Sequence, residues 1–438
     1  MKTMKAPTAC VLVVLCLLAS SCKISGPGGI FGKASPHEKY RQMLLNAGLE
    51  NTALGREWVA AAEKSLLNPL KVTISYKETG YFPADQARAS AISFEARQGQ
   101  KVFISFQRQP VKDFSVYVDL WEERNSSNKK LLAYADTGAS GFEHEIEKSG
   151  RYILRVQSEL LRSGQYELSI TTGPSLAFPV RDGKAQSFWG AARDAGARKH
   201  EGVDIFAPFR TPAIAAAKGT ITRVTTNKLG GKVVFLRPEG KDYNLYYAHL
   251  DDQLVSDGRQ VNAGDTIGLV GTTGNARGGS PHLHFGIYTS SGAVDPYPFI
   301  SKDSRKPAEV KVSASNMGRS MRSANNAILI TDLQLQSSGG IKVAGGSLVE
   351  IIGGTASWYK VLQPDGSMGF IKGSVLKPAT SPLRELKIAG DRPLLDRPDL
   401  TAPRKTVLKQ GETVKVLGTS GSFLFVEGES YSGWITSS

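Results

Sequence analysis

Regular alternation of apolar and polar residues dominates the chain between Lys71 and Gly173. Stretches such as AISFEARQGQKVFISFQ, FSVYVDLWEE and GRYILRVQSE alternate in this way, and turn residues separate them. Because successive side chains on a strand point to opposite faces, the pattern predicts strands with one buried face. The spacing of these stretches predicts an antiparallel β-sandwich over residues 71–174.

Helical spacing precedes the predicted sandwich, over residues 37–70. Gly48 and Asn51 separate two short apolar patterns, each with the period of a helix. We expect a helical hairpin that packs on the sandwich and carries no catalytic group. The apolar residues that define its two helices are Met43, Leu44 and Leu45 in the first and Trp58, Val59, Ala62, Leu66 and Leu67 in the second.

An internal repeat occupies the C-terminal part of the chain. Gly346, Val349, Trp358 and Val361 recur 65 residues later as Gly411, Val414, Phe423 and Val426, and GFI at Gly369 recurs as GWI at Gly433. The repeat predicts two similar modules, named repeat 1 (residues 326–379) and repeat 2 (residues 380–438), after a linker at 303–325. We expect most of their aromatic residues to be core residues.

Length and composition agree with several small modules. A chain of 438 residues predicts roughly three domains, and short Val/Ile/Thr/Tyr runs between turn residues favour strands. The predicted fold class is therefore mainly β and multidomain.

The N-terminus has the composition of an export signal. Lys2 and Lys5 precede an apolar run, Cys10 to Leu18, that is too short to span a bilayer, and small residues follow it. We expect residues 1–21 to be a signal peptide, and a transmembrane anchor is the weaker alternative.

Cys22 follows this signal directly. All three cysteines lie within the first 22 residues, so the mature chain cannot form an internal disulfide. The stretch resembles the lipobox of bacterial lipoproteins, although Ala19 stands where that pattern usually has leucine. The resemblance implies lipidation of Cys22 and a membrane partner through this N-terminal lipid anchor. The Gly/Ser/Pro composition of the residues after Cys22 predicts a tether at residues 22–36. The expected location is the cell envelope, at the outer membrane or the periplasmic face; secretion with a free thiol is the alternative.

The net charge of +14 favours anionic surroundings, such as acidic polymers or membrane surfaces. No long basic run is interleaved with aromatic residues, so nucleic acid is not expected as a partner.

Residues 175–302 carry the candidate chemistry, because four of the six histidines lie there: His200, His249, His282 and His284. His282 and His284 lie two apart in a strand-like run, so they share a face. His200 and Asp204 lie four apart in a segment whose Gly202 and β-branched neighbours favour extended chain. Zinc hydrolases commonly use three nitrogen or oxygen ligands and leave one position for water. His200, Asp204 and one histidine of the pair can supply these ligands, which leaves two histidines for proton transfer and oxyanion stabilisation.

The segments HEGVDIFAP, YYAHL, GDTIGLVGTTGNARGGSPHLHFGI and VDPYPFI follow one another over roughly 120 residues. Together they resemble the lysostaphin-like (LytM-type) zinc metallopeptidases of the bacterial cell wall. The resemblance implies a LytM-type antiparallel β domain in which His200, Asp204 and His284 hold one Zn²⁺. It also implies that His249 and His282 flank the bound water as base and transition-state stabiliser.

Two positions depart from the family's pattern. Arg210 stands where the family usually has glycine, and Gly286 stands where an acidic residue is common. Neither departure removes a ligand or a catalytic histidine, so both bear on specificity.

Two further resemblances concern the predicted sandwich and the two C-terminal repeats. The segment SGRYILRVQSELLRSGQYELSI resembles the pre-peptidase C-terminal domain, with another jelly-roll sandwich as the alternative. The two repeats resemble bacterial SH3-like domains, whose usual role is to hold cell-wall peptide or another partner.

The leading hypothesis is a zinc-dependent endopeptidase that hydrolyses peptide bonds in peptidoglycan stem peptides or cross-bridges, for wall remodelling or lysis. The main alternative is a non-catalytic envelope protein that binds wall peptides or activates a partner amidase. A metal-storage or sensing site is a third reading, and it gives His249 no role.

Overall fold

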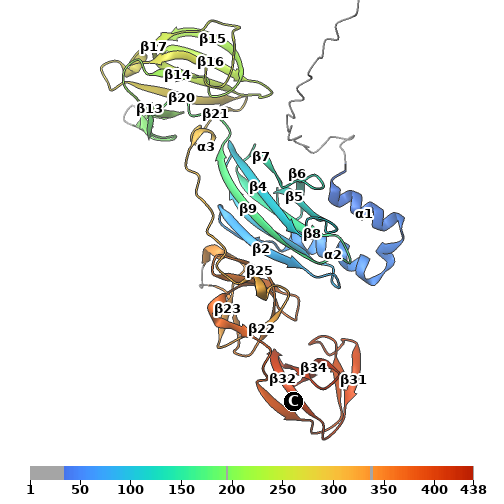
Figure 1. The fold of residues 1–438 in the computed structure, drawn as a ribbon. Helices are drawn as coiled ribbons and strands as arrows, with labels where there is room; N and C mark the ends of the chain where they lie inside the picture. The colour runs from blue at the N-terminus through green and yellow to red at the C-terminus, as the bar shows by residue number, and fades with distance from the viewer. Residues whose placement is uncertain (1–33, 194–195, 336–338, 438) are drawn as a thin grey trace, which may run out of the picture.

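The structure is a computed structural model that describes residues 34–193, 196–335 and 339–437. The predicted signal peptide and Cys22 lie outside these residues. Strands far outnumber helices in the described chain, so the prediction of a mainly β fold with a short N-terminal helical hairpin is confirmed (Figure 1). Within the described ranges, no helix has the length and apolar character needed to cross a bilayer.

The helical hairpin consists of α1 (Pro36–Asn46) and α2 (Ala53–Leu67), joined by a 3-10 turn (Leu49–Asn51). Ser35 and Thr52 cap the two helices, because their side-chain oxygens accept backbone N–H groups of the first turn. The fully buried Trp58 fixes the hairpin on the sandwich: its Nε1 donates to the carbonyl of Ser158 at 2.8 Å. The ring of His37 stacks on Trp58 with 4.6 Å between ring centroids.

Two sheets packed face to face form the sandwich, and their inward-facing residues share one core. The first sheet has the order β1 (Leu70–Lys71), β3 (Ala89–Ala96), β8 (Gly150–Ser158), β5 (Val116–Glu123) and β6 (Lys129–Tyr134). The sandwich part of the second sheet has the order β2 (Tyr76–Phe82), β9 (Gly164–Pro174), β4 (Gln100–Gln109) and β7 (Gly141–Glu145).

The second sheet does not end at the sandwich, because β2 also pairs with a strand of repeat 1. Thr79 and Gly80 lie opposite Gly354 and Gly353, and glycines on both strands leave room for close approach. The strands that continue the sheet are β25 (Leu348–Thr355), β26 (Trp358–Leu362) and β27 (Met368–Lys372). Strand β22 (Ser320–Ser323) pairs with β25 and with β28 (Leu376–Pro378). Strands β23 (Ala327–Leu329) and β24 (Ile341–Val343) form a separate two-stranded sheet.

Strand β22 lies in the stretch that the sequence pattern assigned to the linker at 303–325. It pairs with β25 and β28 and so belongs to the body of repeat 1. Its four residues, SMRS, are too few and too polar to show an alternating pattern, which is why the sequence gives no sign of it.

The histidine-rich region (residues 175–302) is built on a sheet with the order β10 (Lys184–Ser187), β13 (Val203–Phe206), β20 (His282–Thr289), β17 (Asn244–Gln253), β16 (Gly231–Pro238), β15 (Gly219–Asn227) and β18 (Gln260–Val261). Three further strands pair with this sheet or with each other: β14 (Pro212–Ile214), β19 (Thr266–Val270) and β21 (Gly292–Val294). Strands β11 (Ala192–Arg193) and β12 (Arg198–Lys199) form a separate two-stranded hairpin. A short helix, α3 (Tyr297–Ile300), follows β21 in the chain. The region has its own hydrophobic core.

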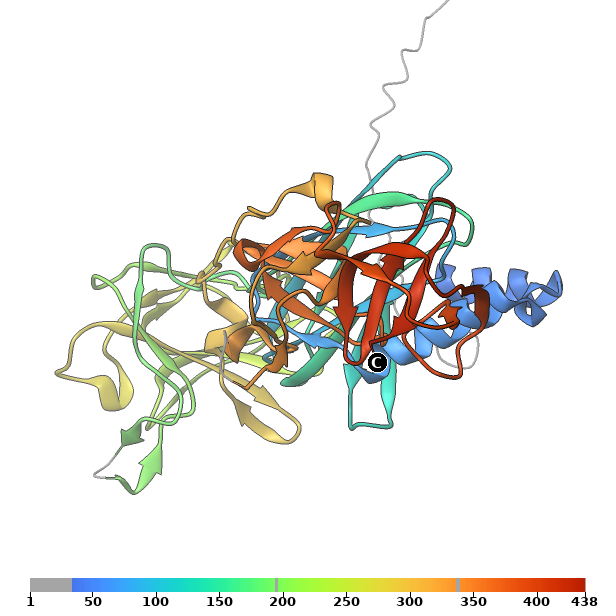
Figure 2. The same cartoon turned by 90° about the horizontal axis from the view of Figure 1, so that it is seen from below.

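Figures 1 and 2 show the histidine-rich region and the N-terminal helices on opposite sides of the sandwich. The histidine-rich region contacts the sandwich through Phe299 of α3, whose ring packs directly against Gly99. A Cβ added at Gly99 would lie 2.1 Å from a carbon of this ring, so only glycine fits there. Lys241 and Glu145 add an ion pair at 2.8 Å across the same contact.

Repeat 2 contains a sheet with the order β29 (Arg384–Lys387), β32 (Thr413–Ser420), β33 (Phe423–Glu427), β34 (Ser432–Thr436), β30 (Arg392–Leu395) and β31 (Arg404–Leu408). Trp434, with Phe423 and Phe425 beside it, packs against Leu348 of repeat 1. Trp358 of repeat 1 packs in turn against the core of the sandwich. Trp358 therefore contributes to the contact of repeat 1 with the sandwich, and Trp434 contributes to the contact of repeat 2 with repeat 1.

A buried ion pair joins repeat 1 to the sandwich. The ammonium of Lys360 on β26 contacts a carboxylate oxygen of Glu78 on β2, and both side chains are 1% exposed. Tyr76 and Tyr166 donate their hydroxyls to Glu78 at 2.6 and 2.8 Å, and Lys360 also donates to Ser90 at 3.0 Å. Each charge is therefore paired and hydrogen-bonded, as a buried charge requires.

Lys360→Met should lower the free energy of unfolding by about 3–5 kcal/mol, because it leaves the Glu78 carboxylate buried without a cation. The double variant Lys360→Met/Glu78→Gln should recover much of this loss, because it buries no lone charge. Urea unfolding followed by intrinsic fluorescence measures both effects.

Lys377→Met removes an exposed cation from β28 of the same repeat and serves as the control. It should change the free energy of unfolding by less than about 0.5 kcal/mol. A single Lys360→Met variant as stable as this control would contradict the structural role of the pair.

Candidate active site

The register of two antiparallel strands brings the predicted ligands together. Asp204 on β13 lies directly opposite His284 on β20, and Phe206 lies opposite His282. On the other side of β20, Ala248 of β17 lies opposite His284. Because β20 runs between β13 and β17, both histidines of the HLH sequence face a site flanked by the other two strands.

His200 reaches the same site from outside strand β13. It follows β12, and a bend at Gly202 separates it from the start of β13 at Val203. The backbone N–H of His200 donates to Ala191 at 2.9 Å, and its Nδ1 lies 3.0 Å from the carbonyl of Phe188. The carbonyl accepts the Nδ1 proton, which leaves Nε2 of the neutral imidazole free as a ligand atom.

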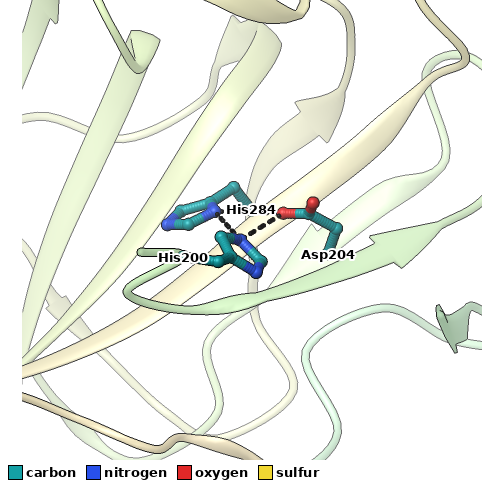
Figure 3. Close-up of side chains that lie close together, drawn as sticks. All are labelled: His200, Asp204 and His284. Atoms are coloured by element: carbon teal, nitrogen blue, oxygen red, sulfur yellow. Dashed lines mark hydrogen bonds and ion pairs between the residues drawn. The ribbon is translucent and has the colours of Figure 1, made fainter. Parts of the chain in front are cut away.

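Three donor atoms converge from these elements (Figure 3). His200 Nε2 lies 3.0 Å from Asp204 Oδ1 and 3.0 Å from His284 Nδ1, and His284 Nδ1 lies 3.0 Å from Asp204 Oδ1. His200 and Asp204 are buried, and His284 is partly buried. Two nitrogens and one oxygen therefore form a nearly equilateral triangle at the floor of the site.

This donor set fits a zinc ion. Imidazole nitrogens and a carboxylate oxygen are common zinc ligands, and tetrahedral bonds of about 2.0–2.1 Å hold ligand atoms roughly 3.3 Å apart. The donors need to separate by only a few tenths of an ångström to adopt that spacing. A face of three donors also leaves a fourth position open to the cleft, as in hydrolytic zinc sites.

His249 lies beside this triangle because the backbone of β17 departs from regular strand geometry. Strict alternation would turn His249 away from the face that Ala248 shares with His284. A change of register between β16 and β17 and a left-handed φ of 61° at His249 bring both residues to the cleft. A left-handed φ is strained for a residue other than glycine, and such strain is often kept at functional sites.

Backbone carbonyls orient the two remaining histidines. His249 Nδ1 lies 2.9 Å from the carbonyl of Thr273, and His282 Nδ1 lies 2.9 Å from the carbonyl of Ser280. Each carbonyl can accept the Nδ1 proton, which leaves Nε2 as the ring nitrogen available to a second partner. The two rings stand 5.0 Å apart between centroids.

Burial and neighbouring groups set the charges of the site's side chains. Burial alone would raise the pKa of Asp204, but hydrogen bonds with His200 and His284 outweigh it and hold that pKa well below its usual range. Burial, with the nearby His282 and His284, lowers the pKa of His249 to about 4. Burial also lowers the pKa of His284. At neutral pH the site therefore presents a carboxylate beside uncharged His249 and His284.

The five residues line a cleft of about 520 Å³. Its walls include Arg193 and Arg198 from the β11–β12 hairpin, and the rings of Tyr246 and Tyr288. Tyr246 and Tyr288 pack edge to face at 5.7 Å between ring centroids. Neither the residue type nor the spacing of Arg193 and the two tyrosines assigns them to the site in advance.

Comparison with known proteins gives an independent result for this region. Residues 198–296 match the model of peptidase family M23. The sequence is also 31% identical to the catalytic domain of lysostaphin from Staphylococcus simulans, over 27% of this chain and 92% of that domain, with a TM-score of 0.25. Residues 198–296 are therefore a peptidase family M23 domain, called the M23 domain below. The predicted likeness to lysostaphin and LytM-type peptidases is confirmed for the M23 domain.

Two curated relatives are similar to this chain over only part of their own length. The L-Ala--D-Glu endopeptidase of Bacillus subtilis is 36% identical over 135 residues, which are 28% of this chain and 41% of that protein. The peptidoglycan DD-endopeptidase ShyC of Vibrio cholerae is 39% identical over 88 residues, which are 20% of each chain. This chain therefore spans about two fifths or less of these relatives.

The two departures from the family's pattern have local explanations in the M23 domain. Arg210 has a left-handed φ of 62°, the conformation that a glycine adopts without strain, and its guanidinium forms an ion pair with Asp251. A Cβ at Gly286 would lie 3.0 Å from the ring of Tyr288 and 3.3 Å from the carbonyl of Glu201. Gly286 thus leaves space for the tyrosine wall of the cleft.

Gly202→Ala should weaken zinc binding by the M23 domain at least tenfold, because its Cβ would lie 2.5–2.6 Å from His284 Cε1 and Nε2. Competition with a chromophoric chelator measures the dissociation constant. Gly390→Ala places a Cβ in open space in repeat 2 and should leave zinc binding unchanged. Equal zinc affinity of the two variants would contradict this role of Gly202.

Proposed function

We propose that the chain is a zinc-dependent endopeptidase that hydrolyses peptide bonds in peptidoglycan stem peptides or cross-bridges. The main support is the triangle of His200 Nε2, Asp204 Oδ1 and His284 Nδ1, with 3.0 Å on each side, in one cleft with His249 and His282. Membership in family M23 and the named activities of the two curated relatives add support for a cell-wall hydrolase.

In this proposal, His200, Asp204 and His284 hold the metal, and His249 and His282 act on the reacting atoms. Bound zinc supplies a Lewis acid that polarises the scissile carbonyl and acidifies a water molecule. His249 and His282 present Nε2 atoms to the cleft, where one of them accepts the proton of the water. The other, once protonated, donates to the oxyanion that develops on the carbonyl oxygen.

The cell envelope is the proposed site of action. A lipid on Cys22 would hold the peptidase domain within reach of the wall, and the net charge of +14 favours an anionic polymer as surroundings. The two repeats are proposed to hold wall peptide or another partner, and attachment to the same chain would raise the local concentration of substrate.

His200→Ala should abolish both stoichiometric zinc binding and the release of muropeptides with new peptide ends. His249→Ala and His282→Ala should retain zinc and lose at least about 100-fold in cleavage rate, because each removes a group that acts on the proton or the oxyanion. Zinc analysis of the purified chain and mass spectrometry of digested peptidoglycans measure the two properties separately.

Arg259→Ala changes an exposed residue that directly precedes β18 and does not line the cleft, so it serves as the control and should keep both properties. A wild-type chain that binds zinc but releases no peptide ends from chemically distinct peptidoglycans would contradict the proposed activity. That outcome would favour a non-catalytic envelope protein that binds wall peptides or activates an amidase.

A further inference from the structure

The carboxylate of Asp204 has two oxygens with different surroundings. Oδ1 faces His200 and His284 at 3.0 Å each. Oδ2 accepts a hydrogen bond from Arg193 Nη2 at 2.6 Å. Oδ1 is therefore directed at the candidate metal position, and the Arg193 guanidinium is hydrogen-bonded to Oδ2.

Arg193 is fixed by contacts other than its bond to Asp204. Its Nη2 also donates to Ser187 Oγ at 2.7 Å, and Ser187 lies opposite Asp204 in the pairing of β10 with β13. Arg193 lies on β11, whose partner strand β12 leads directly into His200. The same hairpin therefore positions the His200 ring and the cation behind Asp204.

This arrangement restricts how Asp204 can bind a cation. A carboxylate binds a metal through one oxygen or through both, and a charge-assisted hydrogen bond to one oxygen disfavours the second mode. The fixed guanidinium also orients the plane of the carboxylate, so that Oδ1 stays within the triangle of donors. A ligand held in this way loses less conformational freedom when the metal binds.

We propose that Arg193 is a positioning residue that limits Asp204 to a single ligand oxygen. Through this bond it keeps the metal four-coordinate, with one position left for water. The inference rests on the proposed zinc site, and it assigns a specific role to a residue outside the HEGVD sequence. Arg193 touches neither the metal nor the substrate in this role.

Arg193→Gln should weaken zinc binding about 10–100-fold, as measured by chelator competition on the full chain. Its cobalt-substituted form should absorb less strongly in the visible range, because binding through both oxygens of Asp204 raises the coordination number. The Arg193 side chain is 32% exposed, so we expect the variant to fold and to keep the melting temperature of the wild type.

Two variants complete the experiment. Lys184→Gln removes a positive charge from an exposed residue of β10, the strand that carries Ser187, and it should leave zinc affinity and the cobalt spectrum unchanged. Arg193→Lys keeps the charge and should restore part of the affinity. Equal affinities and spectra for Arg193→Gln and Lys184→Gln would overturn the role of Arg193 while leaving the zinc site intact. A wild-type chain that binds no zinc would overturn the inference together with the proposed function.

Discussion

The antiparallel pairing of β13 with β20 is the constraint on which the candidate site depends. It sets Asp204 opposite His284 and leaves His282 two residues away on the same face. A shift of this pairing by one residue would turn one strand's side chains to the other face and separate the carboxylate from the imidazoles. The buried core residues between them, Val203, Ile205, Leu283 and Phe285, oppose such a shift, because it would expose them. The hydrophobic core thus determines the geometry of the polar site.

The rest of the chain forms a supporting body in which each module docks on its neighbour. Repeat 1 extends a sheet of the sandwich and inserts Lys360 beside Glu78, and repeat 2 packs its aromatic residues on repeat 1. The M23 domain joins the sandwich where the Phe299 ring covers Gly99. Trp358 and Trp434 both take part in these contacts between modules.

Local patterns in the sequence predicted much of this structure. The period of the apolar residues gave the helical hairpin and the strands, and the HEGVD and HLH sequences identified donors that the structure brings together. Three features had no local signal. Only the family resemblance placed His249 at the site, and it reaches the cleft through a left-handed backbone conformation. Lys360 looks like a solvent-facing residue on a strand, and Arg193 meets Asp204 only after the hairpin folds. Each feature depends on contacts that form in the folded chain, which residue type and spacing do not report.

The proposed function requires one zinc ion bound to His200 Nε2, Asp204 Oδ1 and His284 Nδ1. Anomalous X-ray diffraction at the zinc absorption edge, from crystals of the purified chain grown with zinc, locates the ion. We expect a single strong peak in the M23 domain within bonding distance of these three atoms, with His249 and His282 outside that distance. A peak bound by His249 or His282 in place of any of the three, or no peak in the cleft, would contradict it.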